Sequence, residues 1–193
     1  MRPDGNHEGS DEGRRRKVSR PLEPARFEEM ALAYVARFAT SKAKLAAYLT
    51  RKLRERGWAE DGGPPPDPAA VAQRFAQLDY IDDEAYARMK SGGLQRRGYG
   101  GRRIAQALHA AGIGETHREQ ALPSADEARR AALVMARKRR FGPWSAGVPD
   151  RARREKQIAA MLRAGHALDI VRNIVDAASE EAAEEWCAAA GDD

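Results

Sequence analysis

Two neighbouring carboxylates, Asp82 and Asp83, are the first residues in the sequence whose types could do chemistry. Paired carboxylates can act as general acid and base or hold a metal ion. No third ligand lies near them in the sequence, and Asp82 suits the N-cap of a helix with Asp83 in its first turn. Ile81 and Tyr86 then occupy the two positions of a hydrophobic staple. The pattern predicts a helix start rather than a catalytic or metal site.

A second candidate is the glycine-rich stretch Gly98-Tyr99-Gly100-Gly101, which Arg102 and Arg103 follow. Such a stretch could bind phosphate, but the dinucleotide fingerprint requires a preceding strand, and the preceding segment has a helical pattern. We favour a turn between helices, in which glycines permit positive φ. Two arginines in the first turn of a helix oppose its dipole, which points to an external acidic partner.

The remaining reactive side chains show no arrangement that supports chemistry. The single cysteine, Cys187, lies in an acidic segment where nothing would lower its pKa. The four histidines lack metal-ligand spacing: His7, His109, His117 and His166. We therefore expect no catalytic residue, no metal site and no cofactor.

Five aromatic residues could stack on the bases of single-stranded DNA. Aromatics beside helix caps more often belong to the core, and we favour that interpretation. These residues are Trp58, Trp144, Trp186, Tyr86 and Tyr99.

Charge is distributed unevenly along the chain. The 34 Lys and Arg residues and 29 Asp and Glu residues give a net charge of +5, yet residues 129–163 hold eleven bases and two acids. Residues 176–193 hold seven acids and no base. This asymmetry favours a polyanionic or acidic partner, although a solvated helical surface could explain any single run. The candidate contact residues are Arg88, Arg96, Arg97, Arg102, Arg103, Arg137, Lys138, Arg139, Arg140, Arg151, Arg153 and Arg154.

Composition indicates small helices rather than a deep core of large side chains. Aromatic residues make up 6% of the 193 residues, and the mean hydropathy is −0.71. No apolar run approaches the roughly 18 residues of a membrane span. The first 24 residues are polar and basic, without the apolar stretch of a signal peptide. We expect a cytoplasmic protein with no membrane partner.

Three glycines mark an internal repeat. Gly57, Gly112 and Gly165 are 55 and 53 residues apart, and each follows a large apolar residue by four positions. We interpret them as left-handed glycines that end helices in Schellman motifs. Units of this size cannot bury their apolar faces alone, so we expect the copies to pack in tandem.

The predicted fold is all-α, with three tandem three-helix units in an elongated, curved array. We expect helices at 27–38, 42–56 and 68–78, then 83–96, 101–111 and 115–121, then 125–140, 151–164 and 167–177. The corresponding segments are a disordered basic tail (1–24), three repeats (25–80 with a Pro-rich loop at 61–68, 81–123 and 124–178) and an acidic C-terminal tail (179–193).

The central repeat resembles the RecX family. The family signature runs "YLDD-x-x-F/Y-A", then "R/K-G-x-G-x-x-R/K-I", then "L-x-x-x-G-I/V", and this chain matches it without a gap from Tyr80 to Ile113. Weaker likeness extends the resemblance to residues 28–177. Two departures are the glycine pair Gly92-Gly93 inside a predicted helix and His166 in place of an aromatic. The matching motif residues are Asp82, Asp83, Tyr86, Gly98, Gly100, Ile104, Leu108 and Gly112.

The resemblance implies a regulator that performs no chemistry. It implies binding in the groove of the RecA–single-stranded DNA filament, with inhibition of ATP hydrolysis, strand exchange and filament growth. The partners implied are therefore the RecA filament and, indirectly or weakly, single-stranded DNA, and we expect a monomer. The alternative is a module that binds nucleic acid directly, since three-helix units can present a recognition helix. An enzyme is a distant third.

Overall fold

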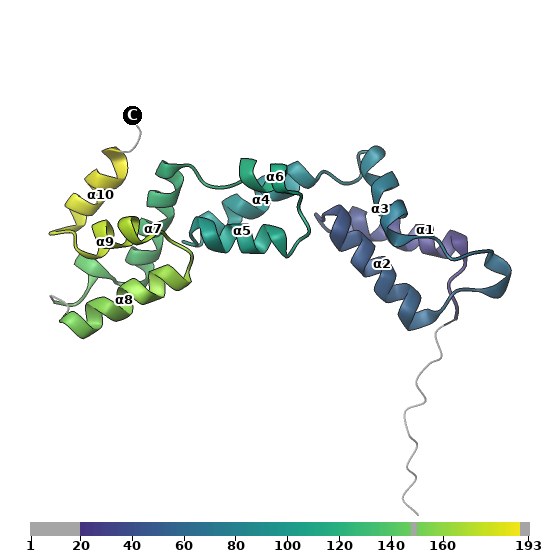
Figure 1. Ribbon diagram of the computed structural model, residues 1–193, viewed down its shortest axis with the longest axis horizontal. Coiled ribbons are helices and arrows are strands. Elements are labelled where there is room, and N and C mark those ends of the chain that lie inside the picture. Colours follow the sequence, from purple (N-terminus) through teal and green to yellow (C-terminus); the bar gives the residue numbers. More distant parts are fainter. Residues whose placement is uncertain (1–19, 148–149, 190–193) are drawn as a thin grey trace, which may run out of the picture.

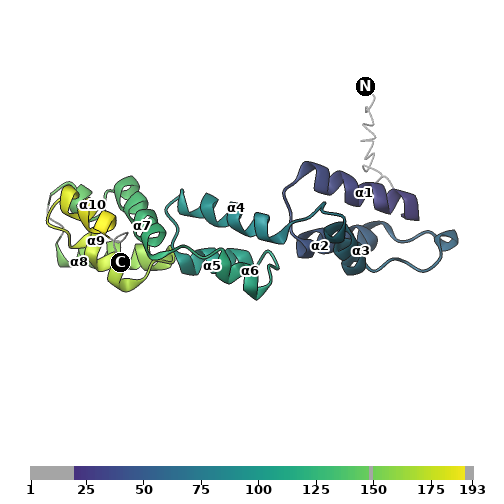
Figure 2. The same ribbon diagram turned by 90° about the horizontal axis from the view of Figure 1, so that it is seen from above.

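The computed structural model describes residues 20–147 and 150–189. They form ten α-helices and two short 3₁₀ turns, and the described residues contain no strand beyond an isolated bridge between Leu22 and Trp58. The helices are grouped into three units that follow one another along an elongated, curved array (Figures 1 and 2). The predicted all-α fold of three tandem units is confirmed.

The first unit consists of α1 (Pro24–Arg37), α2 (Lys42–Arg56) and α3 (Pro68–Gln77). Its core buries Phe27 and Phe75 together with leucines from α2. The Pro-rich loop between α2 and α3 contains a 3₁₀ turn, η1 (Glu60–Gly62).

The second unit consists of α4 (Asp83–Gln95), α5 (Gly101–His109) and α6 (Glu115–Gln120). Ile104 and Leu108 lie one helical turn apart on α5 and are fully buried. The helix α4 runs without a break through Gly92-Gly93. The Arg96 side chain covers this pair, since a Cβ at Gly92 would lie 3.3 Å from its guanidinium.

The third unit contains four helices: α7 (Ala125–Arg139), α8 (Arg151–Arg163), α9 (Leu168–Val175) and α10 (Glu180–Ala188). A 3₁₀ turn, η2 (Gly142–Trp144), connects α7 to the segment before α8. The core is formed mainly by α7, α8 and α9, and α10 adds Ala183 and Cys187, both buried.

Two predictions at the ends of the chain need correction. Leu22, which we assigned to a disordered tail, is fully buried, and its N–H and C=O bond to Gly57 and Ala59. Residues 180–188, which we assigned to an acidic tail, form α10 because its small apolar face packs on α7. The rest of the basic tail, residues 1–19, and of the acidic tail, residues 190–193, lies outside the described residues.

All three repeated glycines end helices with positive φ, and two of them do so in the predicted Schellman motif. Gly112 and Gly165 have φ of 69° and 96°, and the N–H after each donates to a carbonyl five residues back, at Leu108 and Met161. These are Schellman motifs. At Gly57 the pattern differs, because its own N–H donates to Leu53 and the chain then leaves in an extended direction to pair with Leu22.

Candidate partner-binding surface

The glycine-rich stretch after α4 forms the contact between the second and third units. The Gly100 N–H donates to the Ala164 carbonyl (3.0 Å), and the Arg102 N–H donates to the Gly165 carbonyl (3.2 Å). A side chain at Gly100 would overlap the backbone of Gly165, so the two main chains approach as closely as glycine permits. These N–H groups are used within the protein, which excludes them as a phosphate-binding loop.

His166 completes this contact from the third unit. It is 2% exposed, and its Nε2 donates to the Gly98 carbonyl at 3.0 Å. Burial lowers the pKa of His166, and the hydrogen bond to Gly98 opposes this effect in part. These effects favour the neutral imidazole. His166 therefore packs as a core residue in the place where the family pattern has an aromatic ring.

The contact between the first and second units is made by the start of α2 and the end of α5. These correspond to the start of α5 and the end of α8 at the other junction. The Ser41 hydroxyl donates to the Ala111 carbonyl (2.6 Å), and the Lys42 N–H donates to the Asp83 carboxylate (3.0 Å). Asp82 accepts from the Ala85 N–H at 2.8 Å and caps α4. Both carboxylates of the pair therefore have structural partners, as the predicted helix start requires.

Four of the twelve candidate contact residues are held in ion pairs. Arg88 pairs with Glu84 and Arg151 with Glu155, each one helical turn along the same helix. The other two pairs join different helices of the third unit: Arg137 with Glu184, and Arg154 with Asp176. The hydrogen bonds to Asp176 raise the pKa of the Arg154 guanidinium.

The other eight candidates form no ion pair with any carboxylate in residues 20–147 and 150–189. Some are oriented by backbone carbonyls instead, which position the charge without neutralising it. Arg97 donates to Gly93 (3.1 Å), and Arg102 donates to Leu162 (3.0 Å). The eight are Arg96, Arg97, Arg102, Arg103, Lys138, Arg139, Arg140 and Arg153.

Several of these bases gather where α4 ends against α7. The Lys138 ammonium donates to the Arg96 carbonyl at 3.3 Å, which brings the end of α7 to the end of α4. Arg96 and Arg130 line one shallow hollow of about 240 Å³ together with Glu127. The Glu127 carboxylate is engaged in a capping box with Ser124.

We call Arg96, Arg97, Arg130 and Lys138 the junction bases. Arg130 was not among the predicted contact residues, although it belongs to the basic run that the sequence shows. The four bases form no ion pair within the described residues and outnumber the one carboxylate beside them, Glu127, so this cluster suits phosphate or carboxylate groups.

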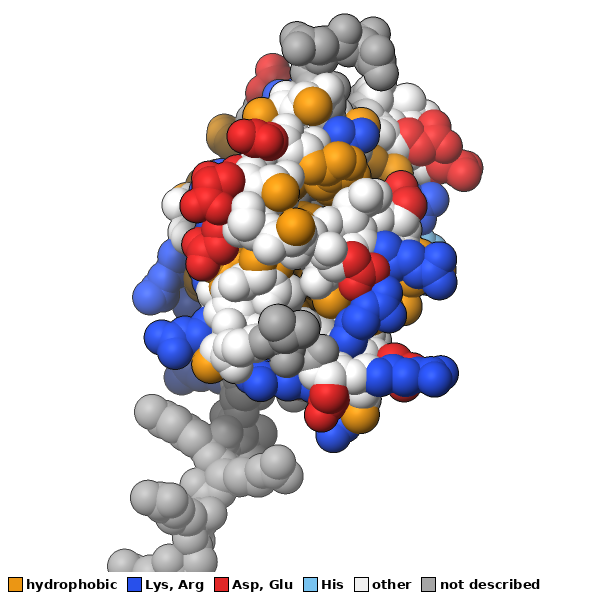
Figure 3. Space-filling model, turned by 90° about the vertical axis from the view of Figure 1, so that its left-hand side faces the viewer, with side chains coloured by type: hydrophobic (Ala, Val, Ile, Leu, Met, Phe, Trp, Pro, Cys, Tyr) orange, Lys and Arg blue, Asp and Glu red, His pale blue; other side chains and the backbone are white. Residues whose placement is uncertain are grey.

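The predicted contact residues do not all lie at this junction. Arg151 and Arg153 stand at the start of α8, whereas its other end, at Ala164, contacts Gly100. A 13-residue helix spans about 20 Å, so these arginines lie roughly that far from the junction. Figure 3, which faces the third unit, shows Lys and Arg mostly over the lower half and Asp and Glu mostly over the upper half.

Most of the aromatic residues belong to the packing, as we favoured. Trp58 packs edge-on against Phe27 with 5.8 Å between the ring centroids, and Tyr86 is buried. The Trp186 ring lies 4.3 Å from the Arg129 guanidinium. Tyr99 is 37% exposed beside Arg97, and it is the aromatic of the five that is open to a partner near the junction bases.

Among the described residues, no group of three or more His, Cys, Asp or Glu side chains is placed to hold a metal ion. No described helix has the length and apolar character to cross a bilayer.

Several known proteins that resemble this chain carry one family name. A family model described as RecX, second three-helix domain, matches residues 82–122. The regulatory protein RecX of Myxococcus xanthus is 30% identical over 178 residues, covering 87% of this chain and 95% of that protein. The regulatory protein RecX of Agrobacterium fabrum is 34% identical over 137 residues, covering 69% of this chain and 73% of that protein.

Two crystal structures have the same fold. RecX from Lactobacillus salivarius has a TM-score of 0.57 and 21% identity, with 76% of this chain and 90% of that one covered. A second RecX structure has a TM-score of 0.59 and 20% identity, with 78% and 71% covered.

Proposed function

Because this chain belongs to the RecX family of regulatory proteins, we propose that it binds the RecA–single-stranded DNA filament and inhibits ATP hydrolysis, strand exchange and filament growth. The proposal includes binding as a monomer and regulation without catalysis by the chain itself. The filament assignment comes from the sequence signature between Tyr80 and Ile113.

The observation that supports this proposal is the unpaired positive charge of the junction bases. A RecA filament presents acidic protein surface and DNA phosphates, and both attract clustered Arg and Lys side chains. The array is elongated (Figure 1), and the candidate bases that form no ion pair within the described residues occur from the end of α4 to the start of α8 rather than in one cleft. This shape suits a groove, where several units contact neighbouring protomers.

The first experiment measures ATP hydrolysis by the cognate RecA on single-stranded DNA with increasing amounts of this protein. Inhibition well below the concentration that saturates the DNA is expected, because the target is the filament. Unchanged hydrolysis together with tight binding to naked DNA would overturn the proposal.

Variants test whether the junction bases carry the contact. The triple variant R96Q/R130Q/K138Q removes three positive charges at the junction, and R26Q/R51Q/R54Q removes three from α1 and α2. We expect the first to weaken RecA inhibition and the second to leave it near the wild-type level. Circular dichroism melting checks that both remain folded. Equal loss in the two variants would mean that net charge, and not the junction, governs binding.

Direct binding of nucleic acid is the second candidate function, since the junction bases suit phosphates equally well. It predicts tight binding to naked DNA with a log–log salt slope of about −0.9 per neutralised phosphate on duplex, and about −0.7 on single strands. A filament regulator shows weaker binding to DNA alone and a strong dependence on RecA.

A further inference from the structure

The helix α10 makes the third unit different from the other two, which have three helices each. It carries Glu180, Glu181, Glu184 and Glu185 and no base. It lies at the end of the array, packed on the basic helix α7 and touching α9 (Figure 1). An acidic helix therefore covers part of the most basic segment of the chain.

The contacts of α10 with α7 resemble those that a nucleotide strand would make. The Glu184 carboxylate pairs with Arg137. Eight residues before Arg137 on α7, the Arg129 guanidinium lies over the Trp186 ring at 4.3 Å from its centroid and donates to the Trp186 carbonyl at 3.1 Å. The Glu184 carboxylate on Arg137 corresponds to a phosphate of a bound strand. The Trp186 ring on Arg129 corresponds to a base.

The anchor that holds α10 is small. Ala183 and Cys187 are its buried residues, and Trp186 is partly buried. Ala183 and Cys187 bury little apolar area, so much of the apolar contact comes from Trp186, which packs against the core of the third unit while remaining only partly buried. The apolar part of the α10 contact therefore offers limited resistance to detachment.

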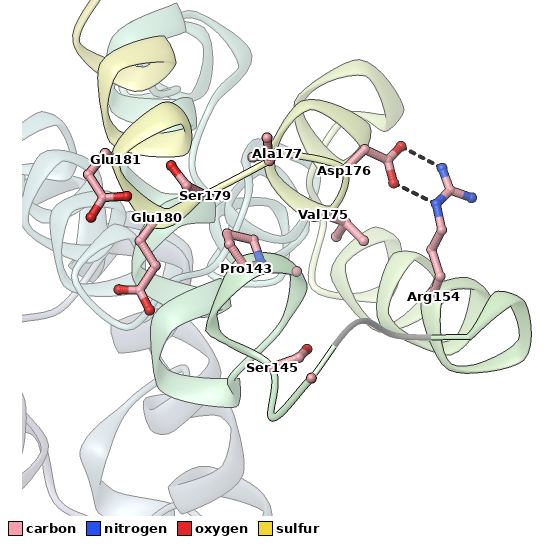
Figure 4. A pocket seen from close by; sticks show the side chains of 12 residues that line it. Pro143, Ser145, Arg154, Val175, Asp176, Ala177, Ser179, Glu180 and Glu181 are labelled. Atoms are coloured by element: carbon pink, nitrogen blue, oxygen red, sulfur yellow. Dashed lines mark hydrogen bonds and ion pairs between the residues drawn. The ribbon is translucent and has the colours of Figure 1, made fainter.

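The linker that leads into α10 is also loosely packed. It borders an open hollow of about 700 Å³, lined on the other side by Pro143 and Ser145 (Figure 4). Before the linker, the ion pair between Arg154 and Asp176 secures the end of α9. The helix α10 and its linker can therefore detach from α7 while the residues up to Asp176 stay in place. The core formed by α7, α8 and α9 then remains intact.

We propose that α10 is an internal competitor that occupies the α7 surface around Arg129 and Arg137, and that single-stranded nucleic acid displaces it. In the free protein Glu184 and Trp186 take the places of phosphate and base. When a strand binds, Arg129 and Arg137 exchange these partners for the strand and add to the charge of the junction bases. This inference rests on the proposed function for its partner, single-stranded DNA.

The first test compares E184Q with E185Q, using fluorescence anisotropy of a labelled oligothymidylate. Both variants lose one negative charge from the same helix, but only Glu184 pairs with Arg137 in the described structure. E184Q is expected to bind about twofold to fivefold more tightly than E185Q, the range for the loss of an exposed ion pair. Equal affinity of the two variants would overturn the proposal, because net charge alone would then explain the change.

A second test follows displacement directly by amide hydrogen exchange of the wild-type protein with and without the oligonucleotide. Exchange should rise in residues 180–188 and stay unchanged in α8 when the strand binds. Unchanged or slower exchange in α10 would contradict displacement. Inhibition of RecA is measured separately, so α10 could fail as a competitor while the proposed function stands.

Discussion

The hydroxyl of Ser41 donates a 2.6 Å hydrogen bond to the carbonyl of Ala111, seventy residues further along the chain. At the next junction the N–H of Gly100 donates to the carbonyl of Ala164 at 3.0 Å. Ser41 and Gly100 are the N-caps of the second helix in their units, and each alanine precedes the glycine that ends the second helix of the next unit. One arrangement of helix ends therefore joins all three units.

Replacing Ser41 with alanine should destabilise the protein more than the loss of an ordinary cap. Ser41 also accepts from the Lys44 N–H at 3.3 Å, so the change removes a cap and leaves the buried Ala111 carbonyl without this donor. We expect a loss of about 1–3 kcal/mol in urea unfolding. S124A, which removes a cap that makes no contact between units, should cost about 1 kcal/mol or less. Equal costs would show that the Ala111 bond contributes nothing.

A methyl group at Gly100 should disturb the junction between the second and third units. G100A places a Cβ against the Gly165 backbone, which cannot move without breaking the junction hydrogen bonds. Overpacking of this kind costs about 1–3 kcal/mol, and RecA inhibition should weaken with it. Gly114 is the matched control, because it is also an N-cap in extended conformation and a Cβ there meets nothing within 4 Å. Thermal melts in which G100A matches G114A would contradict the close approach.

Stability should fall in mild acid because of His166. Its pKa is lowered in the folded protein by burial, so as the pH falls below about 6.5 the unfolded chain binds the proton first. The free energy of unfolding should be insensitive to His166 above that pH and decrease below it, by at most about 1.4 kcal/mol per pH unit. Urea unfolding at several pH values, compared with H166Q, isolates this contribution. A pH dependence as steep in H166Q as in the wild type would assign the effect to other groups.

Arg153 and Arg154 are neighbours with different roles. Arg154 pairs with Asp176 on α9, so R154E should lower the melting temperature by setting two carboxylates against each other. Arg153 forms no such pair within the described residues, so R153E should melt close to the wild type. If the start of α8 contacts the filament, R153E weakens inhibition. Unchanged inhibition would exclude this end of the helix from the contact surface.

The helices could be predicted from sequence because their ends are defined by local chemistry. Ser41, Asp82 and Ser124 each cap a helix that begins at the next residue, as expected. The caps act over three residues and leave a direct signal in the sequence. α10 was missed because its buried face consists of Ala183 and Cys187, and no stripe of large apolar residues marks it.

The junctions could not be predicted, because they depend on residues that are distant in sequence and small. Nothing near Gly100 indicates that Gly165 lies against it. The same limit applied to the charges: sequence placed Arg137, Arg153 and Arg154 in one basic group, whereas the fold gives two of them carboxylate partners on other helices. Which bases stay available to a partner is a property of the folded chain.

The main-chain bonds at Gly100 and the Ser41 bond have a mechanical consequence. Similar contacts at the two junctions favour similar relative orientations of successive units, as in tandem-repeat proteins. At the second junction this orientation is held by main-chain hydrogen bonds, whereas at the first junction it depends on the Ser41 hydroxyl. A change in angle at the first junction moves the second and third units together. A small substitution at Ser41 can therefore displace α8 and α10 at the far end of the array.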